Sequence, residues 1–195
     1  MKKWIGRLWL ALWGWEAEGA HPPYDKYVLI AAPHTSNWDL VFTLALAFVF
    51  DVHVHWMGKH TIFRPPFGRL MQWLGGVPIE RHLRKNVVQQ MVDRFAATDR
   101  LVLAVPAEGT RSRTEYWKSG FYYIARQANV PIVMAYLDYK RRRGGFGGVL
   151  HPTGNLRADM DLVRAFYADK IGKYPERFGP VRLREEEEGA VAEES

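Results

Sequence analysis

A histidine and an aspartate five positions apart follow directly on an apolar run. The stretch reads A-P-H-T-S-N-W-D, with His34 after Pro33 and Asp39 at its end. A turn of this length can fold back so that the Asp39 carboxylate holds one imidazole nitrogen protonated, which frees the other nitrogen as a base. This is the His–Asp half of a catalytic triad without a protein nucleophile, so the nucleophile would be a substrate hydroxyl. The plainer interpretation is a capping aspartate and a surface histidine in an ordinary loop.

A second group of residues has the chemistry of phosphate and polyol binding. Residues 106–113 read P-A-E-G-T-R-S-R. Glu108 can accept a hydrogen bond from a polyol hydroxyl, and Gly109 lets backbone N–H groups approach a ligand closely. Arg111 can bind a phosphate through paired donors, and Thr110 adds a hydroxyl donor.

Three further cations stand near these motifs and are predicted to belong to the same site. Lys59 and Arg81 precede residues 106–113, and Lys118 follows them. Each arginine alone also fits an ordinary solvated surface charge. The set as a whole favours a binding site, because a base, a carboxylate and several cations fall at the ends of predicted strands.

The elements that must position these residues alternate between strand and helix. We expect strands at 27–32, 52–57, 76–80, 101–105 and 130–137, and helices at 38–50, 65–74, 84–97, 118–128 and 159–170. This alternation predicts a single α/β domain with a mostly parallel central sheet flanked by helices. The glycine-rich residues 144–148 are predicted to be a turn-rich break.

The first fifteen residues differ in composition from the rest of the chain. Residues 2–15 read K-K-W-I-G-R-L-W-L-A-L-W-G-W and hold four of the eight tryptophans. Their apolar residues have helical spacing, and Trp with Lys is typical of a lipid–water boundary, so we predict a short amphipathic interface helix. The alternative is a helix that packs its Trp rings on the domain. The longest apolar run, 40–50, is too short to cross a bilayer, which takes about 20 residues.

The charge is distributed unevenly along the chain. Residues 185–195 contain six Glu and no Lys or Arg, which leaves 27 basic and 15 acidic residues, or a formal charge of +12, on residues 1–184. A basic domain favours phosphate-bearing partners such as an anionic membrane or nucleic acid. We therefore divide the chain into an interface segment (1–20), a domain (21–184) and a disordered acidic tail (185–195). The chain has no cysteine, which excludes disulfides and thiolate chemistry.

At this point the motifs resemble those of the glycerolipid acyltransferase family, typified by 1-acyl-sn-glycerol-3-phosphate acyltransferases. Residues 34–39 match the His-x4-Asp signature, and residues 76–81 resemble a second block that closes with an arginine. Residues 108–112 match the core of the third block, residues 117–120 the Lys-x-Gly that follows it, and residues 130–133 the start of the fourth. The blocks occur in order between about residues 25 and 140.

The resemblance implies an O-acyltransferase without a metal or other cofactor. His34, oriented by Asp39, would deprotonate the acceptor hydroxyl, which attacks the thioester of acyl-CoA or acyl-carrier protein. The other motif residues would hold a lysophospholipid or related acceptor. Glycerol 3-phosphate or a hydroxyl lipid without phosphate stays open, since Pro106-Ala107 and Met134 depart from the usual blocks. The expected place is the cytoplasmic face of the cell membrane, bound peripherally or monotopically, without nucleic acid.

Two other classes of function remain open. A non-catalytic module that binds anionic lipid would explain the charge and the tryptophans, and the basic run 140–143 could contact lipid phosphates or RNA. A metal hydrolase would use His53 and His55, which share a face on a strand, with His60 close by. No carboxylate or third histidine stands at a persuasive spacing for that site.

Overall fold

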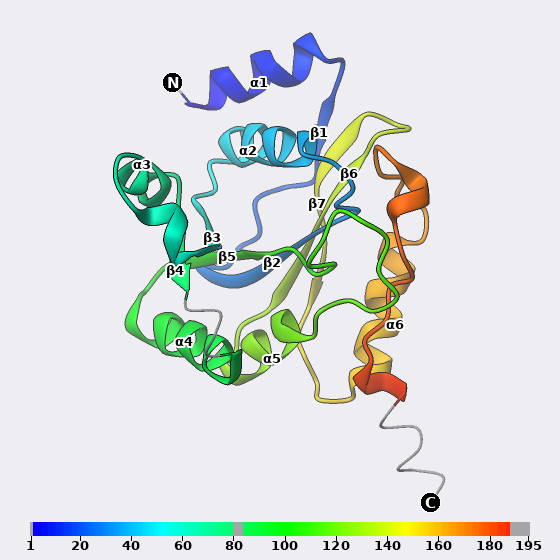
Figure 1. Cartoon of the computed structure of the whole chain (residues 1–195). Helices are drawn as coiled ribbons and strands as arrows, with labels where there is room; N and C mark the ends of the chain where they lie inside the picture. Colours follow the sequence, from blue (N-terminus) through cyan, green and yellow to red (C-terminus); the bar gives the residue numbers. More distant parts are fainter. Residues whose placement is uncertain (1, 80–83, 188–195) are drawn as a thin grey trace, which may run out of the picture.

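Strand and helix alternate along the computed structural model, which describes residues 2–79 and 84–187 (Figure 1). The elements are α1 (Lys2–Leu12), β1 (Glu16–Glu18), β2 (Lys26–Ala32), α2 (Trp38–Phe50), β3 (Val54–Lys59), the 3-10 helix η1 (His60–Phe63), α3 (Gly68–Trp73), β4 (Gly76–Ile79), α4 (Arg84–Ala97), β5 (Leu101–Val105), α5 (Gly120–Gln127), β6 (Ile132–Asp138), β7 (Arg143–Leu150), α6 (Leu156–Tyr167) and the 3-10 helix η2 (Pro175–Arg177). The predicted α/β alternation is confirmed.

Within the described residues the strands form one seven-stranded sheet in the order β1-β7-β6-β2-β5-β3-β4. Neighbouring strands are parallel, apart from the antiparallel pair β6 and β7. The central strand β2 pairs with β5 on one side and with β6 on the other. The predicted mostly parallel sheet is therefore confirmed, and the carboxyl ends of β2, β5 and β6 lie at the same edge.

The central strands are apolar on both faces because helices cover both. On β2, Val28 and Ile30 pack in a core with residues of α4, α5 and α6. Tyr27 and Leu29 point to the opposite face, as alternate residues of a strand do. Figure 1 shows α1 and α2 on one side of the sheet and α4 and α5 on the other.

The amphipathic α1 docks on α2 rather than on the sheet. Leu10 is buried against Phe42 and Leu46 of α2. Gly6 lies so close to α2 that a Cβ atom on it would be 2.5 Å from the carbonyl oxygen of Ala45. Trp9 packs against the same cluster, whereas Trp4, Ile5, Leu8 and Leu12 of α1 are exposed.

The glycine-rich residues 144–148 depart from their prediction, and residues of both end segments contact the domain. Residues 144–148 form most of β7 instead of a turn, because their four glycines admit close neighbours: a Cβ atom on Gly145 would lie 1.9 Å from the carbonyl oxygen of Glu18. The segment 1–20 contains β1, which pairs with β7. The first residues of the predicted tail contact the domain, since Glu185 accepts a hydrogen bond from Ser119 and Glu186 one from Arg164.

Candidate active site

The loops that follow β2, β5 and β6 bring together residues from distant parts of the sequence. His34 and Asp39 lie in the loop after β2 and at the start of α2, and Glu108 and Arg111 lie in the loop after β5. Tyr139 follows β6 directly. The carboxyl edge of a parallel sheet is where α/β proteins bind ligands.

The imidazole of His34 and the carboxylate of Asp39 face each other. His34 Nδ1 lies 3.3 Å from Asp39 Oδ2, and the Asp39 side chain is only 3% exposed. The same Oδ2 accepts hydrogen bonds of 2.8 Å from the backbone N–H groups of Thr35 and Ser36. The Tyr139 hydroxyl donates a hydrogen bond of 2.6 Å to Oδ1. Asp39 is thus fixed by three donors while its carboxylate lies beside Nδ1 of the histidine.

The carboxyl group of Glu108 supports the backbone of His34. Its Oε1 accepts a hydrogen bond of 2.5 Å from the backbone N–H of His34. The residue is 1% exposed, and its Oε2 is buried without a hydrogen-bond partner among the described residues. Burial raises the pKa of this carboxyl to about 7. The buried carboxyl is absent from the lining of the pocket described below, and the expectation that Glu108 binds a substrate hydroxyl stays a prediction.

An open pocket of about 350 Å³ lies in front of the histidine. It is lined by His34, Pro106, Gly109, Thr110, Arg111 and Ser112. Four of the residues predicted from the sequence, His34, Gly109, Thr110 and Arg111, therefore share one surface. Arg111 also contacts the side-chain oxygen of Asn37, which orients its guanidinium toward the loop after β2.

Gly109 shapes the wall of this pocket. Its φ of +69° is in the left-handed region that favours glycine, and its N–H donates to the carbonyl oxygen of Pro106 at 2.9 Å. A Cβ atom here would lie 2.9 Å from Cγ of Lys118. Lys118 is thus next to the pocket, with its aliphatic chain against Gly109 and its backbone N–H bonded to the carbonyl oxygen of Ala107.

The two remaining predicted cations are not placed in the site by the structure. Lys59 ends β3, at the same edge of the sheet as the pocket, and only its backbone is described. Arg81 lies outside the described residues. Both stay predictions.

Two parts of the site were missed by sequence reasoning. Tyr139 reaches Asp39 across 100 positions, and the rule that ligands gather where strands end could have found it. Tyr174 and Arg177, in the segment after α6, bond to Thr35 of the histidine loop across 139 and 142 positions. No pattern in the sequence pointed to that segment.

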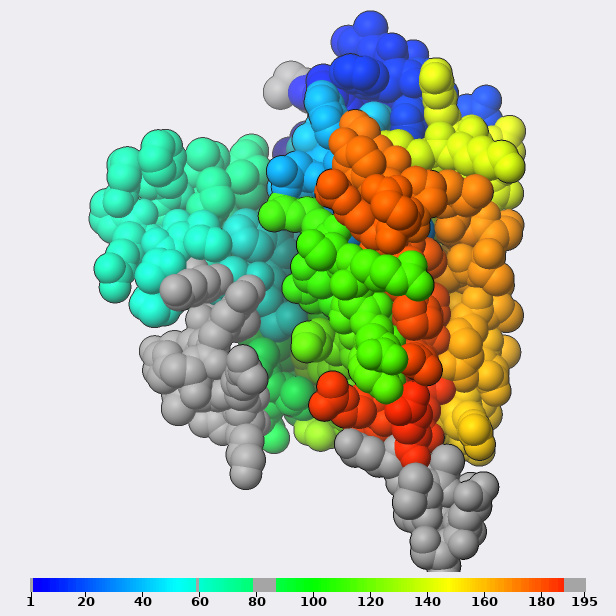
Figure 2. All heavy atoms as spheres, turned by 45° about the vertical axis from the view of Figure 1, so that its right-hand side comes forward, coloured from blue at the N-terminus to red at the C-terminus, as the bar shows by residue number. Residues whose placement is uncertain are grey.

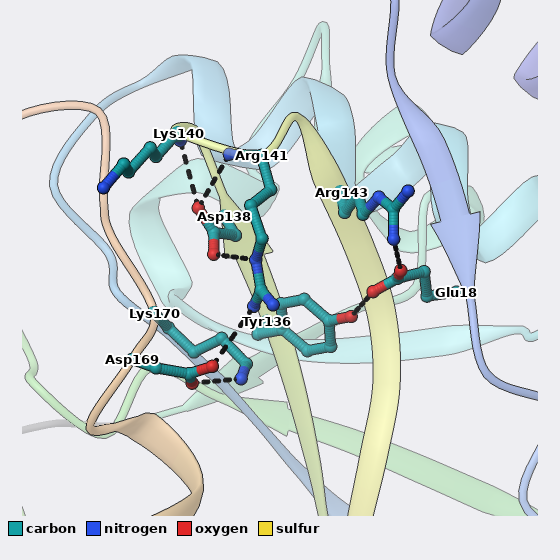
Figure 3. A network of polar contacts seen from close by, with 8 residues as sticks. All are labelled: Glu18, Tyr136, Asp138, Lys140, Arg141, Arg143, Asp169 and Lys170. Atoms are coloured by element: carbon teal, nitrogen blue, oxygen red, sulfur yellow. Dashed lines mark hydrogen bonds and ion pairs between the residues drawn. The ribbon is translucent and has the colours of Figure 1, made fainter.

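The basic run 140–143 is partly neutralised inside the protein. Figure 3 shows Arg141 paired with Asp138 and Arg143 paired with Glu18, at 2.7 and 2.5 Å. Asp138 also accepts the backbone N–H groups of Lys140 and Arg141, which closes the turn between β6 and β7. These pairs favour a structural role for two of the four cations over contact with lipid or RNA.

The histidines considered for a metal site do not form one within the described part of the chain. The rings of His53 and His55 lie 4.8 Å apart. Residues 2–79 and 84–187 contain no group of three or more histidines, cysteines or carboxylates that could hold a metal ion. The metal-hydrolase alternative thus has no ligand set here.

Comparison with known proteins agrees with this arrangement. The model of the family described as Acyltransferase matches residues 16–137, which include His34, Asp39 and Arg111. The solved structure of the 1-acyl-sn-glycerophosphate (LPA) acyltransferase PlsC from Thermotoga maritima is similar, with a TM-score of 0.63 and 15% sequence identity over 86% of this chain and 77% of that chain. At this identity the likeness supports the fold alone. Comparison with curated protein sequences gives no match.

Proposed function

The chain belongs to the acyltransferase family, and from this premise we propose that it moves a fatty acyl group from a thioester donor to the hydroxyl of a lysophospholipid or related glycerolipid. The observation that carries the proposal is the 3.3 Å contact between His34 Nδ1 and Asp39 Oδ2 beside a pocket that contains Arg111. A base, its orienting carboxylate and a phosphate-binding cation are thereby within reach of one substrate.

In the proposed reaction His34 is the general base. With Nδ1 protonated toward Asp39, Nε2 takes the proton of the acceptor hydroxyl as its oxygen attacks the thioester carbonyl carbon. The tetrahedral intermediate then collapses, the carbon–sulfur bond breaks, and the leaving thiolate receives that proton from the imidazolium. Asp39 stabilises the imidazolium between these steps, which is why its three hydrogen-bond donors matter.

The nucleophile belongs to the substrate in this proposal. Ser36 is the nearest hydroxyl by sequence, but it is 5% exposed and its Oγ accepts a hydrogen bond from the backbone N–H of Trp38. The donor would be acyl-CoA or acyl-carrier protein, and the acceptor would lie against Gly109 and Arg111. No step requires a metal ion or another cofactor.

We also propose that the enzyme works at a membrane surface, where a lysolipid acceptor would be found. No helix in the described part of the chain has the length and apolar character to cross a bilayer. The exposed Trp4, Leu8 and Leu12 on α1 have the character of residues that enter a lipid–water boundary. Lys2, Lys3 and Arg7 on the same helix would attract anionic headgroups.

Substitution of the base tests the reaction. We expect His34→Ala to lower kcat by roughly 10²–10⁴-fold, the usual contribution of a general base. Asp39→Asn should be impaired as well, because an amide nitrogen would face the donors that now hold the carboxylate. Turnover is measured with labelled acyl-CoA and a panel of lysolipids and polyols, and circular dichroism reports folding.

A matched control is His151→Ala. His151 is exposed and shares a hydrogen bond with Tyr24 at the other end of the sheet, so its removal should leave turnover unchanged. Wild-type turnover in His34→Ala would instead refute the proposed base, whereas vesicle binding without turnover of any acceptor by the wild type would favour the non-catalytic lipid-binding alternative.

A further inference from the structure

The segment that follows α6 forms a wall of the candidate site. It lies outside residues 16–137, the part of the chain that matches the family. The backbone N–H of Tyr174 donates to Thr35 Oγ1 at 3.2 Å, and Arg177 Nη1 donates to the carbonyl oxygen of Thr35 at 3.5 Å. In Figure 2 this orange segment lies between the light-blue residues at the start of α2 and the green loop after β5. It is therefore held against the loop that carries His34.

A second open pocket, of about 430 Å³, lies between this segment and the two loops. It is lined by Thr35, Ser36, Asn37, Trp38, Arg111, Ser112, Tyr174 and Arg177. Arg111 and Ser112 also line the pocket of His34, so the two pockets lie on either side of this pair. The lining contains two arginines and no carboxylate.

The cations of this second pocket are oriented but only weakly neutralised. The guanidinium of Arg177 stacks on the ring of Tyr174, 4.4 Å from its centroid. Within the described residues its one carboxylate neighbour is Glu176, whose Oε1 lies 3.8 Å from Nε and whose side chain is 69% exposed. Such an exposed contact is worth little. The ammonium of Lys173 lies 5.0 Å from the Trp38 ring and adds a third cation at the rim.

We infer that this pocket is a second phosphate-binding subsite, in which Arg177 and Arg111 bind the phosphate of a phosphorylated substrate. Cations that line one pocket repel each other, and an anion between them removes that repulsion. A guanidinium held by stacking and by one backbone carbonyl is already oriented to donate to phosphate oxygens. The hydroxyl of Ser112 and the amide of Asn37 offer further donors in the same lining.

The inference rests on the proposed function, because it assigns the phosphate to one of the two substrates of acyl transfer. This phosphate belongs either to the headgroup of the lysolipid acceptor or to the phosphopantetheine or nucleotide part of the thioester donor. Trp38 favours a lipid, since its ring lies 5.4 Å from that of Trp13 next to the exposed face of α1. The experiments below separate the two sources.

Binding without turnover tests the subsite itself. Arg177→Gln removes the charge, Arg177→Lys keeps it, and circular dichroism checks that each variant is folded. Calorimetry measures the affinity for CoA and for glycerol 3-phosphate. We expect Arg177→Gln to weaken the binding of at least one of these ligands about tenfold, the usual effect of losing a charged hydrogen bond. Arg177→Lys should recover part of the loss. Arg100→Ala is the matched control, because this exposed arginine precedes β5 at the opposite edge of the sheet.

Kinetics then identifies the source of the phosphate. If it is the acceptor, Arg177→Gln should raise KM for lysophosphatidate about tenfold and leave KM for monoacylglycerol unchanged. If it is the donor, KM should rise for acyl-CoA and not for acyl-N-acetylcysteamine. Equal effects on phosphorylated and phosphate-free partners, or wild-type affinity for both calorimetric ligands, would overturn the subsite. Calorimetry needs no catalysis, so this result is independent of whether His34→Ala retains activity.

Discussion

Glu108 places a buried carboxyl group directly behind the loop that carries His34. Its pKa rises from 4.5 to about 7 because burial disfavours the charged form, although the backbone N–H of His34 offsets part of this effect. At low pH the carboxyl is neutral and easily accommodated, whereas near pH 8 it is a buried anion with one donor. The residue therefore links the stability of the site to pH.

The first prediction concerns this linkage. Because the folded pKa is above the unfolded one, the stabilisation is fully present below pH 4.5 and is lost as pH rises through about 7. The unfolding free energy of the wild type should fall by on the order of 3 kcal/mol relative to Glu108→Gln between pH 4 and 8. Urea unfolding of both proteins measures the difference, in which contributions common to the two proteins largely cancel. Parallel pH profiles would contradict the raised pKa.

Among the described residues, Tyr139 is the one side chain besides His34 that contacts the Asp39 carboxylate, and we predict that its hydroxyl positions this group. Tyr139→Phe keeps the aromatic contact with Trp15, at 4.9 Å, and removes only the hydroxyl. With one donor fewer, Asp39 should attract the imidazolium more strongly, so the acid limb of kcat/KM should move to higher pH while kcat falls about tenfold. Tyr116→Phe is the control, since that hydroxyl bonds to Glu187 on the surface. A lower kcat with an unmoved pH profile would indicate a packing role instead.

At the scale of elements, strong periodic patterns in the sequence predicted the limits of several helices and strands. Close packing between backbones could not be predicted from the sequence. The helices 38–50 and 84–97 and the strand 101–105 have the predicted limits, because long apolar or amphipathic runs fix them. The strand β7 was predicted as a turn because glycine signals conformational freedom in a sequence, whereas here it signals close backbone contact. The His–Asp pair came from local spacing, but Tyr139 and Arg177 reach the site only through the topology of the sheet.

The close contact between α1 and α2 predicts that a glycine-to-alanine substitution in α1 lowers the free energy of unfolding, the opposite of its usual effect in a helix. Alanine normally stabilises a helix by roughly 0.5–1 kcal/mol over glycine. At Gly6 the new Cβ atom would lie 2.5 Å from the Ala45 carbonyl oxygen, a backbone atom, so we expect Gly6→Ala to destabilise the fold by about 1–3 kcal/mol. Gly120→Ala is the matched control, because nothing lies within 4 Å of its added Cβ atom and it should be neutral or stabilising. Urea unfolding distinguishes the two, and a stabilised Gly6→Ala would show that α1 is not tightly docked.

On the whole molecule, exposed apolar side chains and cations gather around α1 and α3. Trp4 and Leu8 of α1 are 72% and 63% exposed, and Trp73 of α3 is 64% exposed. The ammonium of Lys2 lies 5.5 Å from the Trp73 ring, which joins the two helices into one face. Neither residues 2–15 nor 54–79 contain an acidic residue. Lys2 and Lys3 lie in the first turn of α1, where the helix dipole disfavours positive charge. An external anionic surface would offset this cost.

The last prediction tests this face as the membrane contact. Trp4→Glu combined with Leu8→Glu removes two side chains whose transfer into lipid is worth roughly 1.5–3 kcal/mol each, so binding to vesicles that contain anionic phospholipid should weaken at least 100-fold. Cosedimentation measures it, and added salt should weaken the wild type as well, since headgroup attraction is screened. Leu162→Glu is the control, because Leu162 is comparably exposed on α6, on the other face of the sheet. If the double variant binds vesicles as the wild type does, the membrane contact lies elsewhere, while the assignment of His34 as base is unaffected.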